Sequence, residues 1–397
     1  MSNRETILQY ADSRYPAYRE IALRIHAKPE TSNHEDFACG LLSEQLRQEG
    51  FDVTVDVAGH PTGFIGVYRS AKPGPVLAFL AEYDALAGLG HGCGHNLFGA
   101  TSVLAAASLK QVIDGIGGEI RVYGTPGEEG GENGSAKGSF VREGLFRDVD
   151  AALCVHPGSD HNELTHAEIA CAPIRIEFRG KASHASSNPQ DGINALDALV
   201  LVFNAIGLLR QQLPADVRIH GIVTKGGDAP NIIPDLTEGK FYVRAATVKR
   251  MMKVYHQLEE IVKGAALQTG CRGLLEPAQR NLIDNVVPTP SFDEVYRKNL
   301  VSLGEAFENR VFPLGSSDVG NVSQVVPVIQ PMIRISDTPV AGHSIEKREA
   351  CRSETGLRSI ALGAKALALT AMDLIGDPAL LAKIKEDHAR AIAAQDE

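Results

Sequence analysis

The sequence has no tryptophan, and aromatic residues occupy only 6% of its 397 positions. It also lacks an excess of basic residues. The 39 Lys and Arg residues against 49 Asp and Glu give a formal net charge of −10, which disfavours nucleic acid as a partner. No stretch combines the length and the absence of charge that a membrane span needs, so we expect no membrane partner. The first residues contain no apolar secretion signal, so we expect a cytoplasmic protein.

Cysteine is scarce as well, since six residues are spread over the whole chain, which excludes a disulfide scaffold. Cys93 differs from the other five because glycines flank it in the segment 90–96, which also contains His95. The composition, 44% hydrophobic and 22% charged, is that of a globular protein. The chain exceeds the size at which a single hydrophobic core usually stops growing, so two domains are expected.

The first 171 residues read as an α/β unit. Val76–Ala81 is an almost continuous apolar run, which is typical of a strand buried on both faces. The other expected strands cover 52–57, 64–68, 120–123 and 151–155. The expected helices cover 6–26, kinked or broken at Pro16, as well as 34–48 and 97–112. Cys93 with His95, Glu129 and His156 then follow the ends of neighbouring strands, where open α/β sheets bind their ligands.

The pattern changes near residue 172. A strand at 173–178, a helix at 191–213, strands at 217–224 and 236–243, a helix at 249–268 and a final strand follow the order of a ferredoxin-like α+β domain. From residue 285 the α/β character returns, with a strand at 328–335 and a helix at 354–374. We therefore predict an α/β catalytic domain of residues 1–171 and 285–397, with a central mixed sheet flanked by helices. An α+β domain of residues 172–284 interrupts it as a lid or dimerisation domain.

The residue types near these strand ends are those of a divalent-metal hydrolytic site. Cys93 and His95 are two positions apart, so both side chains can face one ion from a turn. Glu129, His156 and His343 add three candidate ligands, and five ligands suit two metals that share one anionic group such as the Cys93 thiolate. Glu128, next to a ligand, is the candidate general base for a water that the metals acidify.

Each of these residues has a simpler interpretation. Cys93 has the size of a core residue, and Glu128 with Glu129 has the composition of a solvated surface doublet. A histidine after an apolar strand, such as His156, is often a hydrogen-bonded core residue. The glycines around the cysteine and around the acidic doublet favour the metal site, because they let backbone approach an ion closely. His91, in the same loop, is more typical of a structural or supporting residue than of a ligand.

The chain resembles the co-catalytic metallopeptidase and aminoacylase family along nearly its whole length. The closest pattern is the amidohydrolase branch, which contains hippurate hydrolase, indole-acetyl amino acid hydrolases, the p-aminobenzoyl-glutamate hydrolase B subunit and aminoacylase-1-like dipeptidases. The motifs that carry the resemblance lie at 82–97, 125–131, 155–157, 180–185, 231–235, 315–321 and 341–344. Asn96 departs from hippurate hydrolase, which has Asp there, and points to the aminobenzoyl-glutamate and dipeptidase members.

The resemblance implies a role for each matching position. Cys93, His95, Glu129, His156 and His343 become ligands of a two-metal centre, with Glu128 as the general base. His184 resembles a residue that reaches across a dimer interface to stabilise the tetrahedral oxyanion. Asn231 and Arg244 resemble substrate-binding positions, and an arginine suits a bidentate contact with a carboxylate. The stretch around Asp318 is a candidate supporting element of the site.

These residues predict a metal-dependent hydrolase that cleaves the amide bond of an N-acyl or N-aroyl amino acid, or of a dipeptide-like compound. Hydrolytic deamination of a small aromatic compound, and a role as one subunit of a hetero-oligomeric hydrolase, remain the alternatives. The expected cofactors are two divalent ions, zinc or manganese in the first place and cobalt or nickel otherwise. We expect a small-molecule amide substrate and a homodimer formed through the inserted domain.

Overall fold

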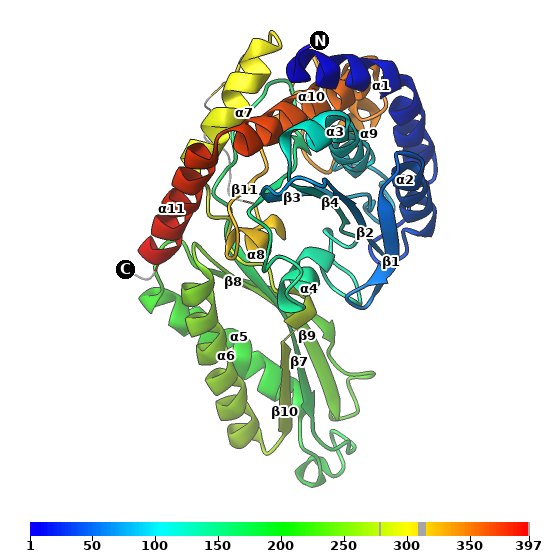
Figure 1. Ribbon diagram of the computed structural model, residues 1–397. Coiled ribbons are helices and arrows are strands. Elements are labelled where there is room, and N and C mark those ends of the chain that lie inside the picture. The colour runs from blue at the N-terminus through cyan, green and yellow to red at the C-terminus, as the bar shows by residue number, and fades with distance from the viewer. Residues whose placement is uncertain (278, 309–314, 396–397) are drawn as a thin grey trace. The chain divides into compact units, whose positions relative to one another are not determined.

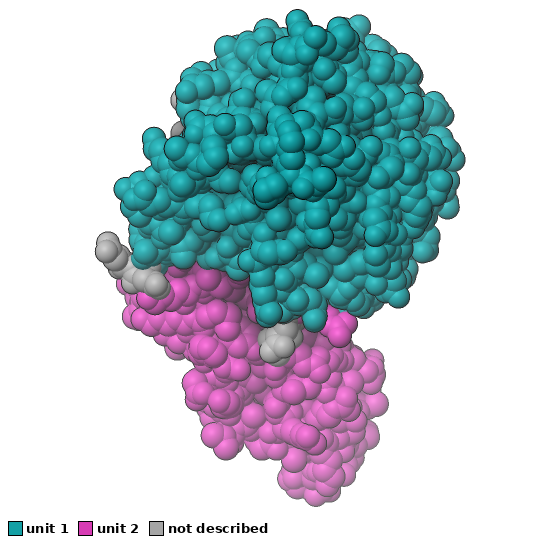
Figure 2. Space-filling model, in the orientation of Figure 1, with its two compact units in different colours: residues 1–167, 286–397 teal, residues 168–285 magenta. Residues whose placement is uncertain are grey.

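The computed structural model describes residues 1–277, 279–308 and 315–395. The chain divides into two compact units, which Figure 2 colours separately. Unit 1 consists of residues 1–167 and 286–397, and unit 2 consists of residues 168–285.

Unit 1 is built on a six-stranded mixed sheet with the strand order β1-β2-β4-β3-β5-β11. Strands β4, β3, β5 and β11 run parallel to one another, whereas β2 pairs antiparallel with β4 and β1 pairs antiparallel with β2. The strands are β1 (Asp52–Val57), β2 (His60–Arg69), β3 (Val76–Ala81), β4 (Glu119–Gly124), β5 (Ala151–Leu153) and β11 (Val328–Ile329). The carboxyl ends of the parallel strands therefore meet at one edge, which is where ligands bind in such sheets.

Helices cover both faces of this sheet (Figure 1). Leu77 and Phe79 of β3 face a core shared with α1 (Asn3–Ala27), α3 (His95–Ile116) and α10 (Glu354–Gly376). Ala78 and Leu80, on the other face of the same strand, pack with residues of α4 (Ala136–Arg142) and α8 (Val319–Ser323). The remaining helices of this unit are α2 (Asp36–Gln48), α7 (Pro290–Ser302), α9 (Ile345–Ala350) and α11 (Pro378–Ala394). The continuous apolar run of β3 follows from this burial on both faces.

Three sequence expectations about unit 1 need correction. Helix α1 continues through Pro16 without a break, because its buried residues on either side pack into the core and offset a cost of about 3 kcal/mol. The strand expected at 328–335 is two short strands, β11 and β12 (Met332–Ile333), separated where Pro331 has no N–H to donate. Helix α10 is long and apolar enough to cross a bilayer by composition, with a mean hydropathy of 1.4, but 67% of that window is buried inside the protein.

Unit 2 is a four-stranded antiparallel sheet with the order β10-β7-β9-β8. Its strands are β7 (Ala170–Arg179), β8 (Arg218–Lys225), β9 (Leu236–Ala245) and β10 (Arg272–Pro277). Helices α5 (Ala195–Leu209) and α6 (Val248–Thr269) pack on one face, where Phe178, Val202 and Leu258 belong to a separate core. Strand β8 forms one edge of the sheet. The chain order of strand, helix, two strands, helix and strand is the ferredoxin-like pattern expected from the sequence.

Candidate metal centre

A tight turn at the start of α3 presents Cys93 and His95 to the same space. Gly94, between them, caps the helix with a φ of 96°, a conformation that L side chains rarely adopt. A Cβ at Gly94 would also lie 2.7 Å from the Pro157 side chain, so the close approach of the two segments requires glycine. His156 stands beside this turn, in the short strand β6 (His156–Pro157), which pairs with β12.

Potential ligand atoms gather here in overlapping groups, within each of which they lie no more than 4.8 Å apart. The first group contains Cys93, His95 and His156, with 3.4 Å between Cys93 Sγ and His156 Nε2. The second contains Cys93, Glu129 and His343, and a third contains His95, Glu128 and Glu129. Cys93 is the residue that the first two groups share, and the third group places Glu128 beside a residue of each. The first two groups are compatible with two ion sites joined by a common thiolate.

His343 reaches the centre from the loop before α9. Its backbone N–H donates to the carbonyl of Gly92 over 3.2 Å, which ties this loop to the cysteine turn. Its Nε2 lies 3.6 Å from Glu129 Oε1. The residue has a φ of 55°, which is uncommon for any residue except glycine and costs backbone energy. The loop thus holds a strained conformation that brings the imidazole of His343 to Glu129.

Asp84, which follows β3, orients His95 and Glu129 through hydrogen bonds. Its buried carboxylate accepts a hydrogen bond from His95 Nδ1 over 2.8 Å, which leaves Nε2 of that ring free to bind an ion. It also accepts from the backbone N–H of Glu129 over 3.0 Å and from the hydroxyl of Ser32 over 2.7 Å. His156 is fixed in a similar way, because its Nδ1 donates to the carbonyl of Pro157 over 2.9 Å.

We expect Asp84→Asn to lower metal affinity by about 10- to 100-fold, because an amide holds the His95 ring and the Glu129 backbone less well than a carboxylate. Competition with a chromophoric chelator measures this affinity directly. Ser32→Ala is the matched control, because it removes one bond to Asp84 and leaves the carboxylate in place. Equal metal affinity of Asp84→Asn and the unaltered protein would show that Asp84 does not support the ligands.

The electrostatics of the cluster favour cations. Burial acts to raise the pKa of Cys93, but His95 and His156 outweigh it and hold that pKa well below its usual value. Burial and the neighbouring Cys93 charge raise the pKa of Glu129 to about 8. Burial, Glu129 and Glu82 raise the pKa of Glu128 well above its usual value. Crowded acidic groups of this kind are stabilised when divalent cations bind between them.

Unsatisfied atoms give an independent test of the fit to metal. His95 Nε2 and Glu129 Oε1 are buried and form no hydrogen bond within the residues that the structure describes. Glu82 Oε2 lies 3.1 Å from His95 Nε2, but not in the direction of a hydrogen bond. These two free atoms lie among the thiolate of Cys93 and the imidazoles of His156 and His343, and such a mixture of sulfur, nitrogen and oxygen donors suits divalent transition metals. The residues present therefore fit a metal centre.

The loop that carries Glu128 and Glu129 is held by a buried carboxylate, Glu35. This side chain accepts from the backbone N–H of Gly127 over 3.0 Å and from the hydroxyl of Thr62 over 2.8 Å. Burial and the negative charge of Asp84 raise its pKa to about 7. Gly127 has a φ of 79°, and a Cβ there would lie 2.6 Å from the carbonyl of Gly134, so this turn also needs glycine.

A fully buried ion-pair network lies next to the acidic doublet. Lys137 Nζ is 2.6 Å from Glu82 Oε1 and 2.6 Å from Asp318 Oδ1, and all three side chains are inaccessible to solvent. Glu128 Oε2 lies 3.9 Å from His95 Nε2. Burial acts to lower the pKa of Lys137, but Asp318 and Glu82 outweigh it and raise that pKa above its usual value. Lys137 is therefore a fixed positive charge, buried between Glu82 and Asp318 next to the candidate metal centre.

The other predicted site residues lie in unit 2. His184 and Asn231 are neighbours there, because the N–H of Ala185 donates to the carbonyl of Asn231 over 3.0 Å. Both are exposed. Arg244 lies near the end of β9, opposite Arg218 of β8, with its guanidinium 5.3 Å from the ring centre of Tyr242. The roles of these residues at the metal centre stay predictions.

Sequence reasoning did not assign a role to four residues that support the site: Glu35, Glu82, Asp84 and Lys137. Glu82 and Asp84 had a usable signal, because they follow a buried strand at the ligand-binding edge of the sheet. Glu35 and Lys137 had none, since each is defined by contacts with residues far along the chain. Asp318, named from the sequence as a supporting candidate, is in the buried network.

Comparisons with known proteins agree with this geometry. The family model described as the peptidase dimerisation domain of the M20 family matches residues 171–270. The chain is 36% identical to Xaa-Arg dipeptidase of Mus musculus, over 91% of this chain and 86% of that protein. It is 30% identical to the B subunit of p-aminobenzoyl-glutamate hydrolase from Escherichia coli (strain K12), over 95% of this chain and 93% of that protein.

Solved structures share the fold. A putative aminohydrolase from methicillin-resistant Staphylococcus aureus has a TM-score of 0.77 at 21% identity and covers 94% of this chain and 100% of its own. A dinuclear metal binding peptidase from the M20 family of Bacillus subtilis has a TM-score of 0.64 at 17% identity, with coverage of 91% and 99%. The sequence relatives and the family model show that the chain belongs to the M20 family and is a metal-dependent amidohydrolase, an enzyme that hydrolyses C–N bonds.

Proposed function

We propose that the enzyme cleaves the amide bond of an N-acyl or N-aroyl amino acid, or of a dipeptide-like compound, with Glu128 as the general base. The observation that carries this proposal is the gathering of four candidate ligand residues around the thiolate of Cys93, with a further carboxylate, Glu128, beside them. The names of the relatives support the substrate class. Xaa-Arg dipeptidase, p-aminobenzoyl-glutamate hydrolase and indole-3-acetyl-aspartic acid hydrolase all describe an amide bond to an amino acid.

We assign Cys93, His95 and His156 to one divalent ion, and Cys93, Glu129 and His343 to a second. When bound, such ions lower the pKa of a coordinated water and polarise an amide carbonyl. Zinc and manganese suit this mixture of sulfur, nitrogen and oxygen ligands best, and cobalt or nickel could replace them.

Glu128 carries out the proton transfers of the reaction. Glu128 accepts a proton from the attacking water as the new C–O bond forms, and the carbonyl oxygen takes up negative charge. The same carboxyl group later donates that proton to the leaving nitrogen as the C–N bond breaks. The products are a carboxylic acid and an amine. The proton that Glu128 takes from water is the one that it gives to the amine, so the residue ends in its starting state. Because Glu128 is largely buried, at 12% side-chain exposure, its proton is not readily lost to bulk water.

A release assay tests the substrate class. The purified chain is depleted of metal, reconstituted with each candidate ion, and supplied with N-acyl amino acids, N-aroyl amino acids, and dipeptides. We expect free amino acid to appear only after reconstitution. Release of ammonia without free amino acid would instead indicate deamination. Activity that appears only after a second, different subunit is added would indicate a hetero-oligomeric hydrolase, a possibility raised by the two named subunits of p-aminobenzoyl-glutamate hydrolase.

We also propose that the enzyme is a homodimer formed through unit 2 and that it works in the cytoplasm. The edge strand β8 exposes Ile222 and Val223, at 63% and 47%, and unpaired edge strands with apolar residues favour pairing with a second copy. The match of residues 171–270 to a dimerisation domain supports the same surface. All six cysteines are free thiols, which suits a reducing compartment.

His184 has the chemistry that oxyanion stabilisation needs. Its Nδ1 accepts hydrogen bonds from the backbone N–H groups of Ser186 and Ser187, each over 3.3 Å. Because Nδ1 accepts, the proton of the neutral ring must be on Nε2. His184 therefore presents an N–H donor from an exposed loop, and we propose that it serves the metal centre of the partner subunit in a homodimer.

Mixed dimers test this role. Glu128→Gln and His184→Ala should each be nearly inactive alone. When the two variants are co-refolded, a mixed dimer contains one site with both residues intact, so about a quarter of normal activity should return with statistical mixing. The control pairs Glu128→Gln with the double variant Glu128→Gln/His184→Ala, which offers no complete site. A mixture no more active than its parts would show that His184 does not act across subunits.

A further inference from the structure

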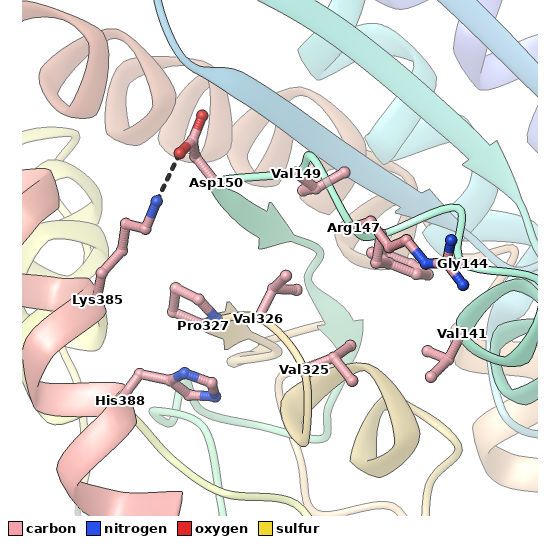
Figure 3. Close-up of a pocket in the computed structure, with 11 residues that line it drawn as sticks. Val141, Gly144, Arg147, Val149, Asp150, Val325, Val326, Pro327, Lys385 and His388 are labelled. Carbon is pink, nitrogen blue, oxygen red and sulfur yellow. Dashed lines mark hydrogen bonds and ion pairs between the residues drawn. The ribbon is translucent and has the colours of Figure 1, made fainter.

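Unit 1 contains a cavity of about 430 Å³, none of whose lining residues belongs to the candidate metal centre. Figure 3 shows it between the end of α4, the segment after α8 and the side of α11. Much of its wall is apolar, formed by Val149, Val325, Val326 and Pro327. Val325 is 48% exposed although it is a large aliphatic residue. The cavity therefore offers an apolar surface that no described part of the protein fully covers.

One wall of this cavity holds an uncompensated positive charge. The side chain of Arg147 lies over Gly144, where a Cβ would come within 2.6 Å of its Nε. Gly144 has a φ of 77°, so both its conformation and this contact require glycine. Arg147 forms no ion pair and no side-chain hydrogen bond within the residues that the structure describes. Its guanidinium is free to bind an anion.

The second cation of the cavity is already neutralised. Lys385 Nζ pairs with Asp150 Oδ1 over 2.7 Å, as the dashed line in Figure 3 shows. The other carboxylate oxygen of Asp150 accepts the N–H of Val76 over 2.9 Å. The net charge available to a ligand is therefore that of Arg147 alone. This suits a single carboxylate better than a phosphate with two negative charges.

His388 adds a hydrogen-bond acceptor to the cavity. Its side chain is 7% exposed, and its ring enters the cavity from α11 (Figure 3). Nε2 lies 2.7 Å from the carbonyl oxygen of Ser323, so this nitrogen must donate. In the neutral ring Nδ1 then carries a lone pair, and no described residue donates to it. Burial lowers the pKa of His388, which agrees with the neutral form.

We propose that this cavity binds a small organic carboxylate that carries an apolar group and a hydrogen-bond donor. The carboxylate pairs with Arg147, the apolar group packs on Val325 and Val326, and the donor meets Nδ1 of His388. The cavity volume lies within the range of small-molecule sites. The acids and amino acids released by amide hydrolysis belong to this class, and that link alone rests on the proposed function.

Calorimetric titration of the metal-loaded protein with 2-hydroxy-4-methylpentanoate tests this site. The compound has the carboxylate, the donor and the apolar group, and the difference between the unaltered protein and Arg147→Met isolates the cavity from any binding at the metal centre. We expect Arg147→Met to weaken this binding at least about tenfold, as expected for a lost charge-assisted hydrogen bond. His388→Phe should weaken it as well. Lys383→Met, on an exposed position of the same helix, should leave it unchanged.

The neutral amide of the same compound provides a test that needs no variant, since it keeps the shape and loses the charge. It should bind at least about tenfold more weakly to the unaltered protein. Equal binding of the acid by the unaltered protein and by Arg147→Met would overturn the proposal. Equal losses in His388→Phe and Lys383→Met would overturn it too, because the effect would not be specific to the cavity.

Discussion

Replacement of Glu128 by glutamine is expected to lower kcat by about 100- to 10,000-fold, the contribution typical of a general base, while both metal ions stay bound. The amide cannot accept the proton of the attacking water, but it fills the same space. The neighbouring Glu129, which belongs to the ligand group with Cys93 and His343, remains in place. Turnover of the best amide substrate, with metal content by mass spectrometry on the same samples, measures both quantities.

Two further substitutions distinguish the proposed role of Glu128 from the roles of nearby carboxylates. Glu129→Gln should lose metal together with activity, because it removes a ligand. Glu132→Gln is the matched control, since Glu132 lies in the same loop but is 65% exposed and pairs with His34. Near-normal turnover of Glu128→Gln, or loss of its metal, would contradict the assignment of Glu128 as the base.

Replacement of Lys137 by methionine is expected to have the second large effect. Lys137 is the positive charge between Glu82 and Asp318, and its removal leaves these two buried carboxylates without the cation that they share. Loss of one partner of a buried ion pair costs about 3–5 kcal/mol, which urea denaturation would detect as a lower free energy of unfolding. Activity should fall as well. Without Lys137 the negative charge of Glu82 is no longer neutralised, and it then acts more strongly on His95, whose Nε2 lies 3.1 Å away, and on Glu128, whose pKa it raises.

A compensating substitution distinguishes this electrostatic role from a loss of packing. In the double variant Lys137→Met/Asp318→Asn, one of the two carboxylates is neutral, so part of the stability and of kcat should return. The readout that matters is the split between kcat and KM. The Lys137 side chain is inaccessible to solvent and so to substrate, and we therefore expect kcat to change and KM to stay nearly constant. A double variant no better than Lys137→Met would indicate that the methylene groups of Lys137 matter more than its charge.

Local patterns of the sequence identified most of the residues that the structure brings together in the candidate site. Glycines around Cys93 and His95 indicated a turn, and the structure shows why, since Gly94 has a left-handed conformation and leaves no room for a Cβ beside Pro157. The apolar run of β3 predicted a strand buried on both faces, and its end led to the ligand-binding edge. These features depend on residues that are close in sequence or on a simple alternation of polarity.

Long-range contacts explain what was not predicted. From the sequence alone Lys137 has the character of a solvated residue in a short helix, and only the fold places it beside Asp318, the residue that precedes α8. Helices α4, α8 and α9 have too few turns to show a periodicity. The strand at 328–335 was predicted as one element because its apolar run outweighed Pro331. Pro16 was predicted to disturb α1, but the core around Tyr18 and Ile21 holds the helix continuous.

Anomalous diffraction from crystals of the metal-loaded enzyme, recorded on both sides of the metal absorption edge, tests the pairing of two ions most directly. The account predicts two anomalous peaks per chain, enclosed by Cys93, His95, Glu129, His156 and His343, with the thiolate next to both. A single peak, or two peaks that leave Cys93 outside the coordination of either ion, would contradict it.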